Sequence, residues 1–537
     1  MTSDKIEAYI AQLDTTDAIK SLFRHYGIGY AWFAMGTVTF AMLATLLSGT
    51  IVNVAIPRIM GAFGIGQDEA QWLSTANLAA ATVGMLLTSW MTQTWGIRAV
   101  VFWSMIAFFI ASFVGGISPN VEFMVLARVV QGVTTGILTP LSIYVIFLLF
   151  PFERQGMVMG VSSIGVMLAP ALGPTIGGML TDSFNWRYVY FLCMVFPVVC
   201  IPLALLFLPN RDGPKPNIPF DWLGMICLSV AITLIFMGLS NGGKEGWDST
   251  LILSYFGGAF ISSVVFIYWQ IRNPKPLLNL AIFRHYRFVI YSITAFAFGA
   301  GLYGSTYLIP LFLQLIQGLT PTDSGLATMP AGILMGVVAP LCGRMSDKYD
   351  PGVLIGFGSI LFFLSFYLMV GSDANTSFWT FAWWMCIGRI GIGFAFPPMS
   401  MGAVRSVPAA MMSEASGVLN FVRQMGGAFG VNLSSLILAR RTEFHLDAIY
   451  STQRYDNSTT MDALAIIRQQ LTVTGLPEVE QTMVAMQYLA RGLHTQASVI
   501  AFKDSFLVSS FLFLFILIPA YLIWKSGRNL HPETGAK

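Results

Sequence analysis

Residues 173–178 read Gly-Pro-Thr-Ile-Gly-Gly and lie inside an apolar run that extends over about residues 157–180. Three glycines and a proline would break a helix in water, because they add backbone freedom and remove a hydrogen-bond donor. Within a bilayer they are tolerated, since neighbouring helices can satisfy the freed backbone groups. Gly173 and Gly177 are four residues apart and form a smooth stripe on one helix face, and Pro174 adds a bend. The segment therefore predicts a close-packed, bendable membrane helix.

The composition indicates that most of the chain lies in a membrane. Hydrophobic residues make up 55% of the 537 positions and charged residues only 10%, against about 25% charged in a soluble domain. A helix that crosses a bilayer needs about 20 apolar residues. Fourteen such stretches can be marked, at residues 30–56, 72–95, 98–117, 121–149, 156–180, 188–208, 221–241, 250–270, 287–316, 323–342, 352–371, 377–401, 412–438 and 504–524. The predicted fold class is an all-α integral membrane protein with 14 transmembrane helices.

The basic residues indicate how these spans are oriented. An even number of spans places both termini on the same side, and seventeen of the 29 Lys and Arg residues fall on that side. The short loops opposite carry three of them, Arg58, Arg187 and Lys244. Cytoplasmic loops of membrane proteins carry an excess of Lys and Arg. Both termini are therefore predicted to be cytoplasmic.

Two segments lie outside the predicted spans. Residues 1–29 mix charged side chains with apolar residues at helical spacing, which predicts an amphipathic segment on the cytoplasmic surface; a partly disordered tail is the alternative. Loop 440–503 has helical apolar spacing over 461–471 and 478–493, and Pro477 suits a helix start. A helical pair there could cap an exit or dock a partner, and a simple lid or connector is the alternative.

Nothing in the chain predicts a cofactor, a metal site or an enzyme. The five cysteines show no zinc spacing, and the five histidines all fall outside the spans. Residues 299–304 match the dinucleotide-binding glycine pattern, but they lie in an apolar span with no preceding strand. Residues 238–244 begin like a phosphate-binding loop, but Glu245 stands where magnesium binding needs Ser or Thr.

The chain also repeats itself. Segment 89–98 after the second span resembles 343–350 after the tenth, and Arg128 in span four matches Arg389 in span twelve, each followed by small residues. Two like halves around a central site are a transporter arrangement. This predicts a cytoplasmic amphipathic N-terminal segment at 1–29, an N-terminal six-helix bundle at 30–208, two inserted transmembrane helices with linkers at 209–275, a C-terminal six-helix bundle at 276–524 including the extracytoplasmic loop 440–503, and a cytoplasmic tail at 525–537.

The order and spacing of these motifs resemble those of the major facilitator superfamily, and within it those of the fourteen-span drug:proton antiporter family of the EmrB/QacA type. Segment 173–178 looks like the family's span-five antiporter motif, Arg128 with Gln131 and Gly132 like its span-four motif, and 343–348 like its cytoplasmic loop motif. The resemblance covers nearly the whole chain. It implies the major facilitator fold, two six-helix bundles plus two inserted helices with N and C termini cytoplasmic.

The resemblance also implies a function. It suggests a secondary active multidrug efflux transporter of the bacterial cytoplasmic (inner) membrane, exporting amphipathic or lipophilic compounds by alternating access in exchange for protons. Its partners would be a small amphipathic drug-like substrate, protons, the lipid bilayer, a periplasmic adaptor and an outer-membrane channel, with no cofactor and no nucleic acid. The alternative is a gradient-driven facilitator or exporter of a specific metabolite without proton coupling at span one.

Two departures from the family pattern bear on mechanism. Ser48 stands where the family's first span carries an Asp, which removes the usual proton or cation site. The first-half loop motif has Gln93 and Thr94 in place of its Asp and Arg, so Asp347 is expected to carry the cytoplasmic latch alone. The residues expected to serve conformational change are Arg128, Gln131, Gly132, Gly173, Pro174, Gly177, Gly178, Gly343, Asp347, Arg389 and Arg423.

No acid falls near the middle of a predicted span, whereas Arg128, Arg389 and Arg423 do. A buried arginine stays charged and needs partners, so each is a functional-site candidate; the alternative is that each bonds helix carbonyls and locks a bundle. The predicted pocket is apolar and slightly positive, and favours neutral or weakly anionic amphiphiles over permanent cations. Its expected polar residues are Asn53, Asn77, Gln131, Tyr307, Gln314, Asn420 and Gln424, and the proton-coupling candidates are Glu122, Asp182 and Asp504.

Overall fold

The computed structural model describes residues 3–11, 13, 17–211, 219–453, 458–471 and 477–528. Within these ranges every regular element is a helix. The long helices are α3 (Tyr30–Phe63), α4 (Gln67–Trp95), α5 (Ile97–Ile117), α6 (Val121–Leu149), α7 (Gln155–Ser183), α8 (Arg187–Phe207), α9 (Trp222–Glu245), α10 (Thr250–Arg272), α11 (Tyr286–Leu315), α12 (Pro321–Ser346), α13 (Pro351–Met369), α14 (Phe378–Arg405), α15 (Met412–Thr452), α17 (Glu478–Phe515) and α18 (Leu517–Arg528). Shorter ones are α1 (Ser3–Ala11), α2 (Asp17–Tyr26), α16 (Ser458–Leu471), η1 (Phe152–Arg154), η2 (Leu280–Arg284) and η3 (Ala409–Met411).

Local sequence explains where many of these helices begin and end. The Asn120 side chain accepts the backbone N–H of Phe123 at the start of α6, and the Ser377 side chain caps α14 in the same way at Thr380. Helix α3 ends where Gly64 adopts a φ of 65°, a left-handed conformation that glycine reaches without strain. These caps let short connections join long apolar helices.

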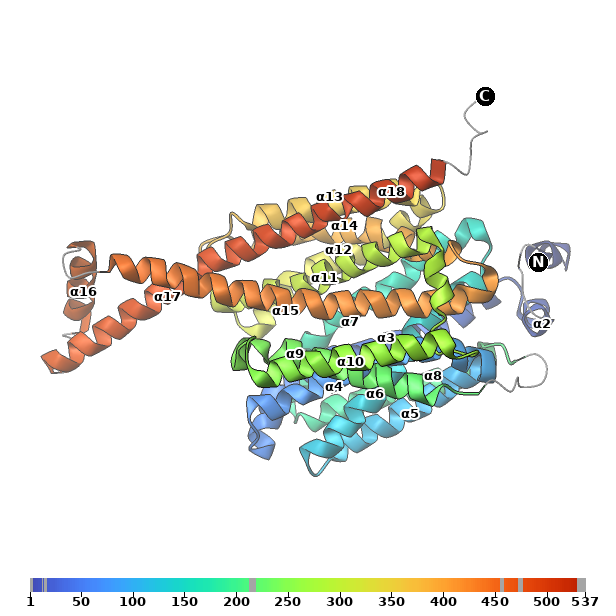
Figure 1. Ribbon diagram of the computed structural model, residues 1–537, viewed down its shortest axis with the longest axis horizontal. Coiled ribbons are helices and arrows are strands. Elements are labelled where there is room, and N and C mark those ends of the chain that lie inside the picture. The colour runs from blue at the N-terminus through green and yellow to red at the C-terminus, as the bar shows by residue number, and fades with distance from the viewer. Residues whose placement is uncertain are drawn as a thin grey trace.

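The two halves of the chain repeat one packing pattern. In the first half α3 packs on α7, α4 on α6, and α5 on α8. In the second half α11 packs on α15, α12 on α14, and α13 on α17 in the corresponding way. The halves meet where α7 contacts α12 and α15 contacts α4. The internal repeat in the sequence is therefore a repeat in structure (Figure 1).

Helices α9 and α10 form an inserted pair. They pack on each other, and α9 also contacts α4 of the first half and α15 of the second. Asp221, just before α9, anchors the pair: its carboxylate accepts the Gly224 N–H, the Trp269 Nε1–H, the Gln270 amide and the Leu277 N–H. The pair thus lies beside the α4–α15 boundary between the halves.

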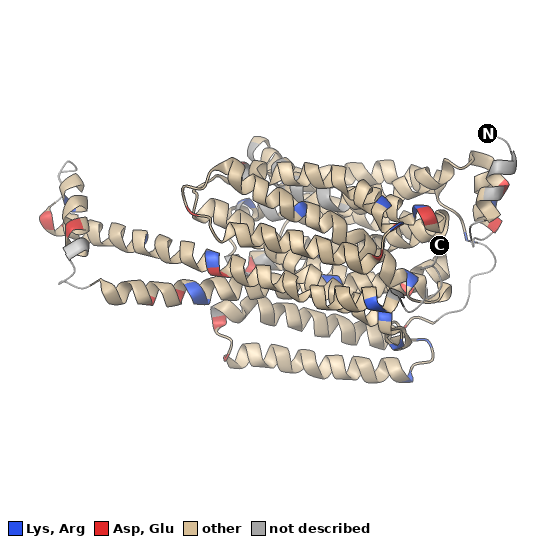
Figure 2. Cartoon of the chain, turned by 90° about the horizontal axis from the view of Figure 1, so that it is seen from above, with Lys and Arg blue, Asp and Glu red and all other residues tan. Residues whose placement is uncertain are grey.

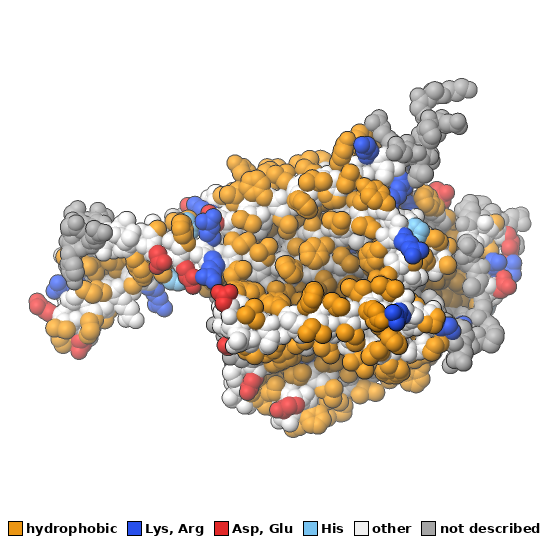
Figure 3. Space-filling view, viewed as in Figure 1, with side chains coloured by type: hydrophobic (Ala, Val, Ile, Leu, Met, Phe, Trp, Pro, Cys, Tyr) orange, Lys and Arg blue, Asp and Glu red, His pale blue; other side chains and the backbone are white. Residues whose placement is uncertain are grey.

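The outer surface of the bundle suits a bilayer. Figure 3 shows hydrophobic side chains over its length, and Figure 2 shows most charged residues near the two ends. In the described part of the chain, ten helical stretches are long and apolar enough to cross a membrane, and the last of them, Glu478–Ser526, comprises α17 and most of α18. Among the described residues, α4, α7, α14 and α15 fall outside that group. Ten of the fourteen predicted spans are therefore supported by length and composition.

The two ends of the bundle carry different segments, and we call them the terminal face and the hairpin face. The terminal face holds α2, η1 and the end of α18, and the hairpin face is the opposite end, where α15 and α17 extend beyond the bundle toward α16 (Figure 1). The helices expected over 461–471 and 478–493 are present, as α16 and the start of α17. The sequence interpretation treated 440–503 as a loop, whereas α15 continues unbroken to Thr452, because neither Gly nor Pro follows Gly430 in it.

The amphipathic N-terminal segment forms α1 and α2 and packs on the protein at the terminal face. Phe23 is fully buried and contacts the rings of Tyr9 and Tyr30. The Tyr9 hydroxyl donates to the carbonyl oxygen of Leu149 at the end of α6, at 3.1 Å. The apolar stripe predicted for this segment is therefore buried against the first half.

Candidate functional site

A carboxylate joins the two halves at the terminal face. Asp347 follows α12, and its oxygens accept the backbone N–H groups of Gly156 and Met157 at 2.8 and 3.1 Å. Both donors lie in the first turn of α7, where backbone N–H groups lack helical partners and the helix dipole is positive. Burial raises the pKa of Asp347, although the two hydrogen bonds and Arg405 oppose that shift.

Arg405 at the end of α14 strengthens the same junction. Its guanidinium donates to the carbonyl oxygen of Phe152 at 2.7 Å and to Oε1 of Gln155 at 2.9 Å. It also lies 3.5 Å from the centre of the Phe152 ring and 4.0 Å from Asp347. In the sequence, Arg405 is only one of the basic residues that indicate orientation. Its position one turn beyond the predicted span twelve was the one sign that it could reach a neighbouring helix at that face.

Small residues let α7 and α12 approach at this junction. Gly156 on α7 lies against the carbonyl of Gly343 on α12, and Gly160 against that of Ala339, with no room for a side chain at either glycine. The glycines of segment 173–178 do not lie at this junction. Gly173 contacts Thr50 on α3, inside the first half. Gly177 likewise contacts Ile51 on α3, and Gly178 faces open space. The side chain of Pro174 lies outside the described residues.

The second boundary between the halves, α4 with α15, is held by neutral groups. The hydroxyls of Thr92 on α4 and Ser413 on α15 lie 3.3 Å apart, and Ser416 on α15 donates to the carbonyl oxygen of Pro140 on the neighbouring α6 at 2.9 Å. Gln93, which stands at the position of the family's acid, instead donates to Ser89 within α4. Asp347 thus bonds across the α7–α12 junction, whereas the described bonds across the other boundary come from hydroxyls. Glu414 at the start of α15 accepts the N–H of Asn279, which lies in its own half.

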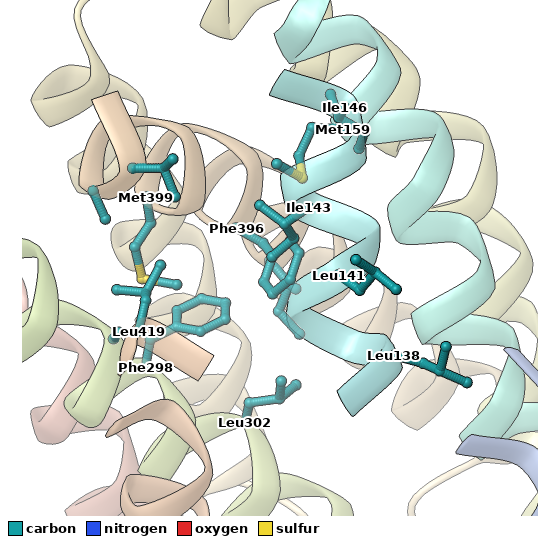
Figure 4. Packing of buried hydrophobic residues seen from close by; sticks show 14 of the residues in the cluster. Leu138, Leu141, Ile143, Ile146, Met159, Phe298, Leu302, Phe396, Met399 and Leu419 are labelled. Carbon is teal, nitrogen blue, oxygen red and sulfur yellow. The ribbon is translucent and has the colours of Figure 1, made fainter. Parts of the chain in front are cut away.

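An apolar layer lies between the halves beside these junctions. Its side chains come from α6 and α7 on one side and from α11, α14 and α15 on the other (Figure 4). They are Ile143, Ile146, Met159, Phe298, Leu302, Phe396, Met399 and Leu419, whereas Leu138 and Leu141 on α6 point away from the second half (Figure 4). Because all are buried, this layer excludes water between the halves near the terminal face.

Arg128 is almost fully buried in the first half. It donates to the carbonyl oxygen of Leu73 at 2.9 Å, to that of Ser48 at 3.3 Å, and to Oε1 of Gln131 at 3.2 Å. Gln131 in turn donates to Ser112 at 3.0 Å. The following Gly132 permits close contact of α6 with α4 at Asn77. The predicted arginine motif therefore ties four helices of the first half together.

The other two intramembrane arginines lie in the second half. Arg423 on α15 donates to Oδ1 of Asn420 and lies 4.7 Å from the centre of the Phe396 ring, while its Nη1 is buried without a partner. Arg389 on α14 is half-buried and forms no hydrogen bond with a described residue. Neither arginine pairs with a carboxylate in the part of the chain that the structure describes.

Most of the predicted pocket residues make contacts between or within helices. Asn77 donates to the carbonyl oxygen of Arg128, Tyr303 to Gln424, and Tyr307 to Ser435. Asn420 donates to the Ser416 carbonyl, and Gln314 is exposed near the end of α11. The Asn53 side chain lies outside the described residues. Arg423, Asn420 and Gln424 share α15; Arg423 bonds Asn420 and lies over the Phe396 ring of the apolar layer, whereas Gln424 accepts from Tyr303.

The predicted proton-coupling acids occupy different environments. Glu122 is exposed in the first turn of α6, and the side chain of Asp182 lies outside the described residues. Asp504 on α17 accepts a hydrogen bond of 2.8 Å from His445 and lies 3.4 Å from Arg441, both on α15. The sequence did not indicate a role for His445, because it lies 59 residues from Asp504 and no local pattern links the two.

Two like-built helical halves, an inserted helix pair, an apolar outer surface and a few buried arginines define a membrane transporter built on an internal repeat. Residues 38–431 match the Major Facilitator Superfamily, and the chain belongs to this superfamily. It is a multi-pass transporter and not an enzyme.

Relatives and solved structures resemble the chain over most of its length. Multidrug export protein EmrB of Escherichia coli K12 is 26% identical over 489 residues, which cover 91% of this chain and 93% of that protein. Fatty acid resistance protein FarB of Neisseria gonorrhoeae is 26% identical over 511 residues, covering 95% and 98%. The crystal structure of the human organic anion transporter MFSD10 matches with a TM-score of 0.57 at 13% identity, covering 90% of this chain and 99% of that one, which shows a shared fold.

Proposed function

We propose that this protein is a secondary active exporter of amphipathic compounds that works by alternating access in exchange for protons. The observation that carries the proposal is the junction of Asp347 and Arg405 with the start of α7, which closes one end of the boundary between two like halves. With fourteen spans and both termini in the cytoplasm, the terminal face is the cytoplasmic one. The described conformation is then closed to the cytoplasm.

The names of the relatives support export of drug-like amphiphiles. Those relatives are a multidrug export protein, a fatty acid resistance protein and, in Acinetobacter baumannii, a colistin resistance protein. Intramembrane arginines without carboxylate partners in the described part of the chain favour neutral or weakly anionic substrates over permanent cations. The proposed contact region is Arg423 with Asn420 and Gln424, next to Phe396, because Arg423 retains an unpaired donor there.

The proposed location is the bacterial inner membrane, with the α15–α17 extension on the periplasmic side. This extension carries exposed apolar side chains, among them Phe444, Val479, Met483 and Tyr488. An adaptor that leads to an outer-membrane channel would cover such side chains. We include this partnership in the proposal on the strength of the family resemblance and of these exposed residues.

The test is transport in inverted membrane vesicles under an imposed pH gradient. With the vesicle interior acidic, a fluorescent weakly anionic amphiphile should accumulate inside, and accumulation should stop when a protonophore collapses the gradient. Uptake of the amphiphile that does not depend on the pH gradient, or its movement out of the vesicles, would contradict proton-driven export. A better rate with quaternary ammonium dyes would contradict only the substrate preference.

A second candidate is a gradient-driven exporter or facilitator of a specific metabolite that lacks proton coupling at span one. Ser48 favours it, because this residue is buried and uncharged where the family carries an acid. Equal transport rates at all imposed pH gradients, with a single preferred substrate, would select this function over multidrug antiport.

A further inference from the structure

The charge of Arg128 has no counter-ion in the described part of the chain. Its side chain is 1% exposed, and its three acceptors are the neutral oxygens of Leu73, Ser48 and Gln131. These bonds use Nε and Nη1, whereas Nη2 donates to no described residue. A buried guanidinium without an opposite charge is costly, because its desolvation is not compensated by an ion pair.

Two buried hydroxyls beside this arginine also have no partner. Ser48 Oγ and Tyr190 OH form no hydrogen bond with a described residue, and their side chains are 1% and 0% exposed. Native proteins satisfy most buried polar atoms, so two unsatisfied hydroxyls next to an unneutralised cation require an explanation.

The contacts place these groups together. Arg128 Nη1 bonds the Ser48 carbonyl, and Tyr190 lies within electrostatic reach of Arg128. Tyr190 and Cys193 are three residues apart on α8 and so share a helix face. Cys193 also interacts electrostatically with Arg128, and the Ser48 hydroxyl has no hydrogen-bond partner among the described residues. Donors from α3, α6 and α8 therefore converge on one region of the first half.

We propose that a monovalent anion binds in the first half between Arg128 Nη2, Ser48 Oγ and Tyr190 OH. One guanidinium and two hydroxyl donors suit a halide or a carboxylate, which accept charge-assisted hydrogen bonds. The bound anion supplies the negative charge that a carboxylate at position 48 would otherwise provide. The anion is either inorganic, such as chloride, or the carboxylate of a transported compound. The proposal does not depend on the direction of transport or on proton exchange.

The test is the thermal stability of the full-length protein purified in detergent. Sodium sulfate, whose anion is divalent and carries no carboxylate, is replaced by chloride or bromide, or by acetate or butyrate, at constant ionic strength. A ligand that binds only the folded protein raises its Tm by mass action, here on the order of 2 °C at a few times the Kd. The response should saturate with anion concentration.

Variants distinguish this site from general salt effects. Ser48→Asp supplies the missing charge from the chain and should abolish the anion response. Tyr190→Phe keeps the ring and removes one donor, so the anion concentration at half response should rise at least about threefold. Ser400→Ala removes a buried unpartnered hydroxyl in the second half and should leave the response unchanged.

Each outcome decides the proposal or the source of the anion. A response to halides that Ser48→Asp lacks supports an inorganic anion, and a response to carboxylates alone supports a substrate headgroup. A Tm that is the same in all the salts overturns the proposal, as does an equal response in wild type and Ser48→Asp. If Ser48→Asp does not fold, an unchanged half-response concentration in Tyr190→Phe overturns it.

Discussion

The Asp347 carboxylate accepts the backbone N–H of Gly156 at 2.8 Å, and so joins two helices of different halves whose residues lie 191 positions apart in the chain. The bond uses no side chain of α7, only the free N–H groups at a helix start. Such a contact can form and break as a unit when α7 moves relative to α12. The charged junction can therefore serve as a switch between two arrangements of the halves.

Replacing Asp347 with Asn should weaken this junction. The neutral amide keeps one acceptor but loses the charge that pairs with Arg405 and the α7 N-terminus, at a cost of about 1–2 kcal/mol. Opening at the terminal face should increase roughly tenfold. The measurement is maleimide labelling of Met159→Cys in a background without the native cysteines, since Met159 is buried in the apolar layer.

Asp323→Asn is the matched control for that experiment. Asp323 lies in the first turn of the same helix at the opposite end and is exposed. Its neutralisation should leave labelling of Met159→Cys unchanged. Equal labelling in Asp347→Asn and wild type would show that the junction does not hold the halves together.

Gly156→Val should block closure of the terminal face. Any side chain at this position meets the Gly343 carbonyl of α12, and overpacking of this kind costs about 1–3 kcal/mol. Transport should fall more than tenfold while the protein still folds, because the open arrangement relieves the clash. Gly257→Val on α10 is the control, since a side chain there meets no atom. Similar transport by the two variants would argue against a close-packed α7–α12 boundary.

The sequence predicted the architecture better than it predicted the contacts between side chains. The length of the apolar runs and the repeated motifs were sufficient to predict two like halves with an inserted pair, because hydrophobicity and periodicity are local properties. The sequence also predicted that Asp347, rather than Gln93, would carry the charged junction. It could not place Arg405 over Phe152, because that pair depends on how α14 and η1 meet across the boundary.

Glycine-rich stripes show a second limit of sequence reasoning. Gly173 and Gly177 do form a close helix contact, but with α3 in their own half, whereas Gly156 and Gly160 make the contact between the halves. Spacing identifies a small-residue face and not the helix that packs on it. The polar residues assigned to a pocket show the same limit, since Asn77 and Tyr307 bond other helices.

Asp221→Asn should loosen the inserted pair. The carboxylate accepts four donors, so an amide NH₂ group in its place would face at least one of them and leave it unpaired. Loss of charged hydrogen bonds and the unpaired donor together cost about 2–4 kcal/mol. The measurement is the Tm of the purified protein, with Asp248→Asn at the exposed α9–α10 turn as the control.

The stability that Asp221 contributes should also depend on pH. Burial alone raises the pKa of this carboxyl, but the four hydrogen bonds outweigh it, and the net pKa lies below the ordinary value. Stability from a lowered acid pKa is fully present above the ordinary value of about 4 and is lost as the pH falls through the folded-state value. Wild type should therefore lose more stability than Asp221→Asn on acidification below about pH 4; parallel pH profiles would rule this out.

Asp504→Asn should reduce proton release when substrate binds. Asp504 joins α17 to His445 and Arg441 of α15 where both helices leave the bundle, so a change in the packing of these helices alters the contacts of this carboxylate. Glu122 is exposed and has no such partners among the described residues. Proton release on addition of substrate to purified protein in weak buffer should fall at least about twofold in Asp504→Asn and stay unchanged in Glu122→Gln. The reverse result would assign coupling to Glu122, and an unchanged release in both variants would exclude these two acids from proton exchange.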